Sequence, residues 1–142
     1  MRSRTAKKTR KTGETDICVA INLDGQGKYN LQTGNGMFDH LLAQLSRHGL
    51  IDLDMSASGD IEVGWHHIVE DTAIALGNAI EEAVGDGRGI TRMGHAFVPL
   101  DEALAMVALD FGGRGHSAVD LGLSDSDLGG LPAQLIDHFM DT

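Results

Sequence analysis

The chain has 142 residues, of which 42% are hydrophobic, with nineteen glycines, two prolines and a formal net charge of −10. This composition fits a single soluble domain with its own core and excludes a chain dominated by disorder. No apolar run approaches the roughly 20 residues of a membrane span, and a single cysteine, Cys18, excludes a disulfide framework. We therefore expect a cytoplasmic protein with no membrane partner.

The N-terminal segment is basic, although the rest of the chain is acidic. Six of the eleven basic residues lie in it: Arg2, Arg4, Lys7, Lys8, Arg10 and Lys11. Such a segment can bind nucleic acid, but this one has no aromatic side chain for stacking on bases. We expect residues 1–13 to form a flexible, solvated arm and expect no nucleic-acid partner.

A half-buried strand is predicted from residue 15 to residue 24, because apolar side chains alternate there with polar or small ones. The glycines at 25 and 27 indicate a turn, and residues 28–32 a second strand, so residues 15–33 are predicted to form a hairpin. Cys18 lies in mid-strand with no motif near it, and we expect it to be structural rather than catalytic.

A helix follows from Met37 to His48, with Gly49 as its expected C-cap. Its spacing brings His40 and Gln44 together at the edge of the apolar side. Residues 51–57 alternate as a third strand.

The next helix begins at the stretch Trp65-His66-His67-Ile68-Val69-Glu70-Asp71 and ends at the glycine-rich residues 85–87. His66 and Glu70 lie four residues apart and point the same way, and His67 and Asp71 form a second such pair. Adjacent helical residues diverge by about 100°, which favours two metal ions, or one metal ion and a base. The alternative is a surface helix start whose acids complement the helix dipole.

The second half of the chain resembles a repeat of the first. An apolar run over residues 104–109 is followed by a glycine-rich turn and residues 116–121, which predicts another hairpin, and residues 131–140 predict a helix. We therefore expect an α+β fold with a complete half-repeat at residues 14–92 and an incomplete one at residues 93–142. The second copy lacks a third strand and a His-His helix of its own.

Six motifs occur in order along the chain, and together they resemble the imidazoleglycerol-phosphate dehydratase family of histidine biosynthesis. The match is collinear from about residue 10 to residue 142. The motifs are Arg10-x-Thr12-x-Glu14-Thr15, Phe38-Asp39-His40-Leu41-Leu42 with Gln44 and His48-Gly49, His66-His67-x-x-Glu70-Asp71, Gly89-Ile90-x-Arg92-x-Gly94, Pro99-x-Asp101-Glu102-Ala103-Leu104, and Leu109-Asp110-x-x-Gly113-Arg114.

This resemblance implies a duplicated β-sheet-and-helix unit of the ribosomal-protein-S5-domain-2-like type. It also implies a paired-manganese site, assembled between subunits of a large symmetric homo-oligomer. Imidazole nitrogen and carboxylate oxygen suit Mn²⁺. The implied metal ligands are His40, His66, His67, Glu70 and His138.

The implied reaction removes water from D-erythro-imidazole-glycerol phosphate to give imidazole-acetol phosphate. Glu14 resembles the proton-abstracting base, with His40 and His67 as candidate catalytic histidines. Gln44 and His48 match substrate-binding positions. Arg92 and Arg114 match positions that bind the substrate phosphate, a task that suits a bidentate guanidinium.

The chain departs from the family pattern in several places. It has no second His-His-x-x-Glu segment and no counterpart of the family's C-terminal phosphate-binding lysine, and Gly115 and His95 replace a usual proline and a common acidic residue. We therefore expect inefficient dehydration by the chain as given. Two alternatives remain: an inactive metal-binding fragment of the enzyme, or a metal-dependent hydrolase, which would need a water nucleophile at an open metal position.

Overall fold

The computed structural model describes residues 3–123 and 126–142. The chain divides into two compact units, Met1–Val84 with Ser117–Thr142, and Gly85–His116. Within the described residues, no helix has the length and apolar character needed to cross a membrane. Sheets and helices occur together in the larger unit, so the predicted α+β class is confirmed.

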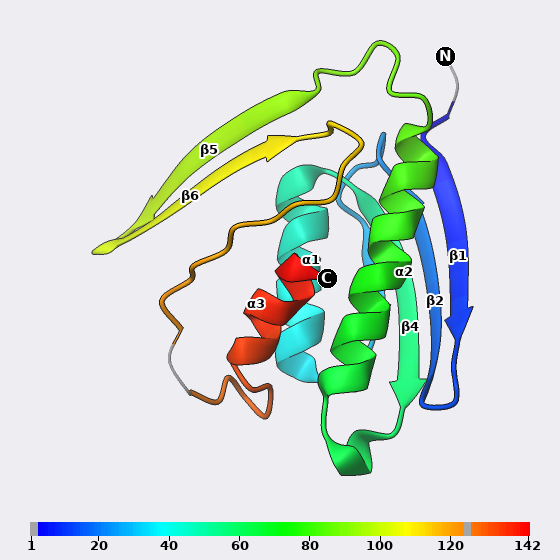
Figure 1. The fold of residues 1–142 in the computed structure, drawn as a ribbon, viewed down its shortest axis with the longest axis vertical. Helices are drawn as coiled ribbons and strands as arrows, with labels where there is room; N and C mark the ends of the chain where they lie inside the picture. The colour runs from blue at the N-terminus through cyan, green and yellow to red at the C-terminus, as the bar shows by residue number, and fades with distance from the viewer. Residues whose placement is uncertain (1–2, 124–125) are drawn as a thin grey trace. The chain divides into compact units, whose positions relative to one another are not determined.

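The larger unit is built on a four-stranded sheet with the order β1-β2-β4-β3 (Figure 1). Its strands are β1 (Thr5–Lys11), β2 (Thr15–Asn22), β3 (Tyr29–Gln32) and β4 (Asp52–Gly59). β2 pairs antiparallel with both β1 and β4, whereas β3 pairs parallel with β4.

The expected flexible arm over residues 1–13 is wrong for Thr5–Lys11, which forms strand β1 along β2. Ala6, Lys8 and Arg10 are paired with Ile21, Val19 and Ile17 of β2, so they share the face that β2 turns inward. Both cations on this face have acidic partners on the long helix described below. The strand therefore places a basic sequence in a sheet while both cations on its inner face are paired.

The predicted hairpin over residues 15–33 is also wrong. Both strands exist, but β3 pairs with β4 and not with β2. A parallel pair cannot be closed by a tight turn and needs a crossover, which here is helix α1 (Gly36–Gly49). Alternation predicts strands but does not encode their partners.

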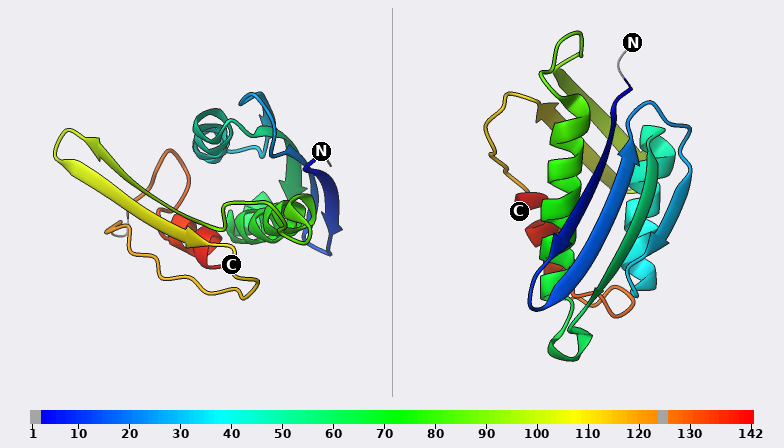
Figure 2. Two further views of the ribbon diagram at one scale, coloured as in Figure 1. Left: turned by 90° about the horizontal axis from the view of Figure 1, so that it is seen from above. Right: turned by 90° about the vertical axis from the view of Figure 1, so that its right-hand side faces the viewer.

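Helix α1 and helix α2 (His66–Val84) lie on one face of the sheet, as the right-hand view of Figure 2 shows. The Asn35 side chain accepts a hydrogen bond from the Phe38 amide and caps α1. The C-cap is Leu50, in the left-handed region with φ 54°, rather than the predicted Gly49. A short 3-10 helix, η1 (Ile61–Val63), leads from β4 into α2.

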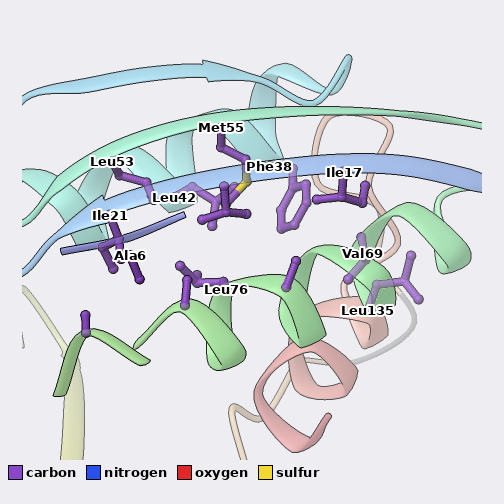
Figure 3. Close-up of a cluster of buried hydrophobic side chains, with 14 of the residues drawn as sticks. Ala6, Ile17, Ile21, Phe38, Leu42, Leu53, Met55, Val69, Leu76 and Leu135 are labelled. Carbon is purple, nitrogen blue, oxygen red and sulfur yellow. The ribbon is translucent and has the colours of Figure 1, made fainter. Parts of the chain in front are cut away.

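The core lies between the sheet and the helices (Figure 3). Ile17 and Met55 point from the sheet toward Val69 and Leu76 of α2, and all four are fully or almost fully buried. Each such side chain contributes roughly 1.5–3 kcal/mol through burial. This packing fixes the first turns of α2 against one end of the sheet, where the candidate site residues lie.

The smaller unit is an antiparallel hairpin of β5 (Met93–Leu100) and β6 (Ala103–Asp110). The hairpin predicted from residues 104–121 is therefore wrong: β6 pairs with the preceding segment, and residues 116–121 form no strand. Every side chain of both strands is exposed.

Candidate metal centre

Three potential metal ligands from two helices of the larger unit gather in one place. His66 is the first residue of α2, Glu70 lies one turn later, and His138 belongs to α3 (Gln134–Asp141). Their candidate ligand atoms lie within 4.8 Å of one another. His66 Nε2 is 3.9 Å from Glu70 Oε2, and the rings of His66 and His138 are stacked with centroids 4.6 Å apart. The predicted pairing of His66 with Glu70 is thus confirmed.

Helix α3 brings His138 to this cluster because its apolar side chains dock on the larger unit. Leu135 is buried in the core, and the ring of Phe139 meets that of Phe38 edge-on with centroids 5.6 Å apart. The Ser117 hydroxyl also donates to the carboxylate of Asp141 at the end of α3. The third ligand therefore depends on tertiary packing and not on sequence spacing.

The donor set fits a divalent transition-metal ion. Among the described residues, His138 Nε2 and Asp137 Oδ1 are buried without any hydrogen-bond partner. An unsatisfied buried polar group costs roughly 1–3 kcal/mol, and an ion bound to His138 would satisfy the ring nitrogen. Imidazole nitrogen and carboxylate oxygen are both ligands of divalent metal ions in proteins.

His67 is not among the residues of this cluster and contacts Asp60. Its Nδ1 lies 2.9 Å and 3.2 Å from the two Asp60 carboxylate oxygens. The hydrogen bond to Asp60 raises the pKa of His67 above its usual value; partial desolvation opposes this shift, and the charges of Asp60, Glu14 and Asp71 add to it. The predicted pairing of His67 with Asp71 is wrong, because each residue has a closer tertiary partner.

The partners of Asp71 come from β1 and the turn between β1 and β2. Arg10 Nε donates to Asp71 at 2.6 Å, and the hydroxyls of Thr15 and Thr12 also donate to its carboxylate. Burial raises the pKa of Asp71, but the hydrogen bonds from Thr15, Arg10 and Thr12 and the charge of Arg10 outweigh burial, so the net pKa is lowered. This network joins the first turns of α2 to the end of the sheet.

Glu14 lies in that same turn, with an exposed side chain. Its backbone is held on both sides: its N–H donates to Thr12 Oγ1 at 3.1 Å, and its carbonyl accepts from the Asp60 N–H at 3.1 Å. One residue, Asp60, thus contacts both candidate catalytic residues: its backbone N–H holds Glu14, and its carboxylate holds His67. Sequence reasoning missed Asp60; the available signal was an acidic residue in the loop just before the His-His pair.

The predicted residues of α1 form a row of their own. Gln44 Nε2 lies 3.5 Å from His40 Nδ1, and its Oε1 lies 3.1 Å from His48 Nε2. His40 is not among the residues gathered around His66. Its role as a ligand stays a prediction.

Both predicted phosphate-binding arginines belong to the smaller unit. Arg92 Nε lies 2.7 Å from Asp110 Oδ1, with both side chains well exposed, and Arg114 is exposed. Their phosphate role likewise stays a prediction.

The sequence is similar to proteins of one family. The family model described as imidazoleglycerol-phosphate dehydratase matches residues 33–142. The imidazoleglycerol-phosphate dehydratase of Albidiferax ferrireducens is 53% identical over 137 residues, which cover 96% of this chain and 67% of that protein. That of Methanoculleus marisnigri is 52% identical over 136 residues, covering 96% and 70%.

Solved structures agree with the sequence comparison. Imidazoleglycerol-phosphate dehydratase from Staphylococcus aureus superposes with a TM-score of 0.83 at 28% identity, covering 96% of this chain and 75% of that one. IGPD from Pyrococcus furiosus superposes with a TM-score of 0.77 at 32% identity, covering 94% and 70%.

Proposed function

This chain belongs to the imidazoleglycerol-phosphate dehydratase family, lyases of histidine biosynthesis, and from that premise we propose that it binds Mn²⁺ and acts on D-erythro-imidazole-glycerol phosphate. The product would be imidazole-acetol phosphate, with release of water. The observation that carries the metal assignment is the cluster of His66, Glu70 and His138, together with the buried, unpartnered Nε2 of His138.

His66, Glu70 and His138 would hold one ion. Bound there, Mn²⁺ would supply Lewis acidity toward the substrate and a fixed point for its orientation. Three protein donors leave about half of the six positions of an octahedral ion open to other donors. Substrate, water and further protein ligands, for which His40 and His67 are our candidates, would fill them.

The protein's own groups would move the protons of the dehydration. A base must remove a proton from a carbon that is not intrinsically acidic, and an acid must protonate the departing hydroxyl. Glu14 suits the first task because its carboxylate is exposed while its backbone is held at both sides. His67 is our candidate for the second, because its hydrogen bond to Asp60 raises its pKa and so favours the protonated ring.

Four further residues are our candidates for substrate recognition. Gln44 and His48, hydrogen-bonded to each other on α1, offer polar contacts to the substrate. Arg92 and Arg114 would bind the phosphate through their guanidinium groups. Release of Arg92 from Asp110 would cost little, because the pair is exposed.

Metal binding is tested by titrating the chain with Mn²⁺ and counting bound ions by electron paramagnetic resonance. His66→Ala and His138→Ala should each weaken binding at least tenfold, whereas His116→Ala, an exposed histidine of the smaller unit, is the matched control. Equal binding by all four proteins would refute the cluster as the metal site. Turnover of imidazole-glycerol phosphate by the same proteins tests the reaction.

We also propose that the chain functions in a homo-oligomer, as its resemblance to the family implies. The open positions of the ion are compatible with a donor from a second copy. Light scattering with and without Mn²⁺ measures the mass of the assembly. A monomer under all conditions that still turned over substrate would refute this proposal.

A further inference from the structure

Asp60 occupies a position where aspartate usually caps a helix, but it does not act as a cap. It is the N-cap residue of η1, and its side chain makes no capping hydrogen bond. An aspartate here normally accepts a bond from an amide in the first turn. Instead, both carboxylate oxygens lie within hydrogen-bonding reach of His67 Nδ1, at 2.9 Å and 3.2 Å.

This contact determines which nitrogen of His67 carries the hydrogen. An ionised carboxylate can only accept, so Nδ1 must donate. In the neutral ring Nε2 then has a free lone pair, and the ring orientation is fixed by the carboxylate. No hydrogen bond within the described residues engages Nε2, so this nitrogen is available to substrate or a ligand.

The backbone of Asp60 holds a second candidate site residue. Its N–H donates to the Glu14 carbonyl at 3.1 Å, directly after strand β4 ends. Glu14 is held from its other side by Thr12, whose hydroxyl also donates to Asp71 of α2. One loop residue thus links the turn that carries Glu14 to the helix that carries His67.

We propose that Asp60 is a positioning residue. Its carboxylate fixes His67 as the Nδ1–H tautomer and leaves Nε2 of His67 available, and its backbone N–H holds the backbone of Glu14. Its effect on turnover rests on the proposed function, whereas its effect on the tautomer does not. Stabilisation alone is a weak explanation of the contact, because the His67 side chain is 41% exposed and exposed ion pairs contribute little.

The test is nitrogen-detected nuclear magnetic resonance of the full chain labelled with ¹⁵N-histidine, at alkaline pH where His67 is neutral. His67→Gln identifies the signal. The unsubstituted chain should show His67 as the Nδ1–H tautomer. Asp60→Ala should shift it toward Nε2–H, whereas Asp60→Asn should preserve Nδ1–H, because an amide oxygen still accepts. Glu62→Ala, an exposed acid two residues away, is the matched control.

Measurements of Mn²⁺ affinity and of turnover connect the tautomer to function. Asp60→Ala should reduce Mn²⁺ affinity or turnover by roughly 10–100-fold, the usual effect of removing a carboxylate behind a functional histidine, and Asp60→Asn should recover part of the loss. Backbone amide spectra establish that each variant is folded.

An unchanged His67 tautomer in folded Asp60→Ala would overturn the proposal, whatever the activity. A shifted tautomer with unchanged affinity and turnover would overturn its positioning role. Absence of turnover in every protein, the unsubstituted chain included, would count against the proposed function alone, and the tautomer result would still decide the assignment of Asp60.

Discussion

Replacement of Asp71 by asparagine should destabilise the larger unit, although the two side chains have almost the same shape. The Asp71 side chain is only 9% exposed and accepts hydrogen bonds from Arg10, Thr12 and Thr15. An asparagine retains one acceptor oxygen, but its NH2 group is itself a donor and would face the donor groups of Arg10 or of the two threonines. The substitution therefore removes the negative charge and one of the two acceptor oxygens, so Arg10 loses its charge-assisted hydrogen bond.

The expected cost follows from these contacts. A hydrogen bond to a charged group contributes about 1.5–3 kcal/mol. Arg10 is partly exposed and can be rehydrated when it loses its partner, so the full penalty for stranding a buried charge, about 3–5 kcal/mol, should not apply. We expect Asp71→Asn to lower the free energy of unfolding by about 2 kcal/mol.

The pH dependence provides a second check. Because the folded pKa of Asp71 is lowered, its contribution is fully present above the unfolded value of about 3.9. The contribution is lost as the pH falls through the lower folded pKa. In Asp71→Asn this part of the acid dependence should be absent, and the variant should show its full loss of unfolding free energy at neutral pH.

Urea unfolding followed by circular dichroism measures both effects. The matched control is Asp24→Asn, because Asp24 also pairs with an arginine, Arg4 just before β1, but on the surface, with 51% of its side chain exposed. The control should lose much less stability. Equal losses in the two variants, or an undiminished acid dependence in Asp71→Asn, would refute the reasoning.

Four further outcomes are expected. Met55→Ala, at a core position only 1% exposed, should cost about 2–5 kcal/mol; a smaller loss in urea unfolding would indicate a loosely packed core. Leu50→Gly should be neutral or stabilising by up to about 1 kcal/mol, since Leu50 is exposed at φ 54°, and a clear loss would contradict this. Asp52→Ala should speed hydrogen exchange at the Gln26 amide, because that N–H donates to Asp52 Oδ1 at 2.7 Å. The pKa of Asp52 is lowered mainly by hydrogen bonds from the backbone amides of Gln26 and Lys28, so in the unsubstituted chain this loop should loosen only as the pH falls below about 4. Alkylation of Cys18, which the register aligns with Ser56 on the outward side of the sheet, should leave Mn²⁺ binding intact, and its loss would refute a purely structural role.

The elements predicted correctly are those whose periodicity matches their burial. The alternation around Ile17 and Val19 and the helical spacing after His66 are both determined locally, and each forms the predicted element. The six motifs also identified the family correctly, because they depend on residue order and not on structure. The similarity to solved dehydratases supports the duplicated unit implied by the resemblance.

Strand β1 escaped prediction because two of its inward-facing side chains, Lys8 and Arg10, are charged and only Ala6 is apolar. Lys8 and Arg10 lie on the inner face of the sheet only because Glu82 and Asp71 of α2 neutralise them. Those partners are far away in the sequence, so the segment resembles a solvated basic arm. The pairing of β3 with β4 was missed for a similar reason, since strand partners are chosen by the tertiary fold.

Only part of the candidate site was predicted, because contacts between residues far apart in the sequence are set by the tertiary fold. His66 and Glu70 are one helical turn apart, and their proximity follows from the sequence. His67 and Asp71 have the same spacing, but Asp60 and Arg10 provide closer partners. The meeting of His138 with His66 depends on the docking of α3, which no local pattern encodes.

The shortness of α3 links cation affinity to tertiary packing. Its eight residues are fewer than the roughly 12–15 at which isolated helices become marginal in water, so docking through Leu135 and Phe139 maintains the helix. Local undocking would remove His138 from the cluster while the sheet remained folded. A cation held by all three donors would favour the docked state, and its apparent affinity would be the intrinsic affinity multiplied by the docked fraction. A change as small as one methyl group at Leu135 could then weaken cation binding without altering any ligand, so that the binding constant would report how well the helix packs.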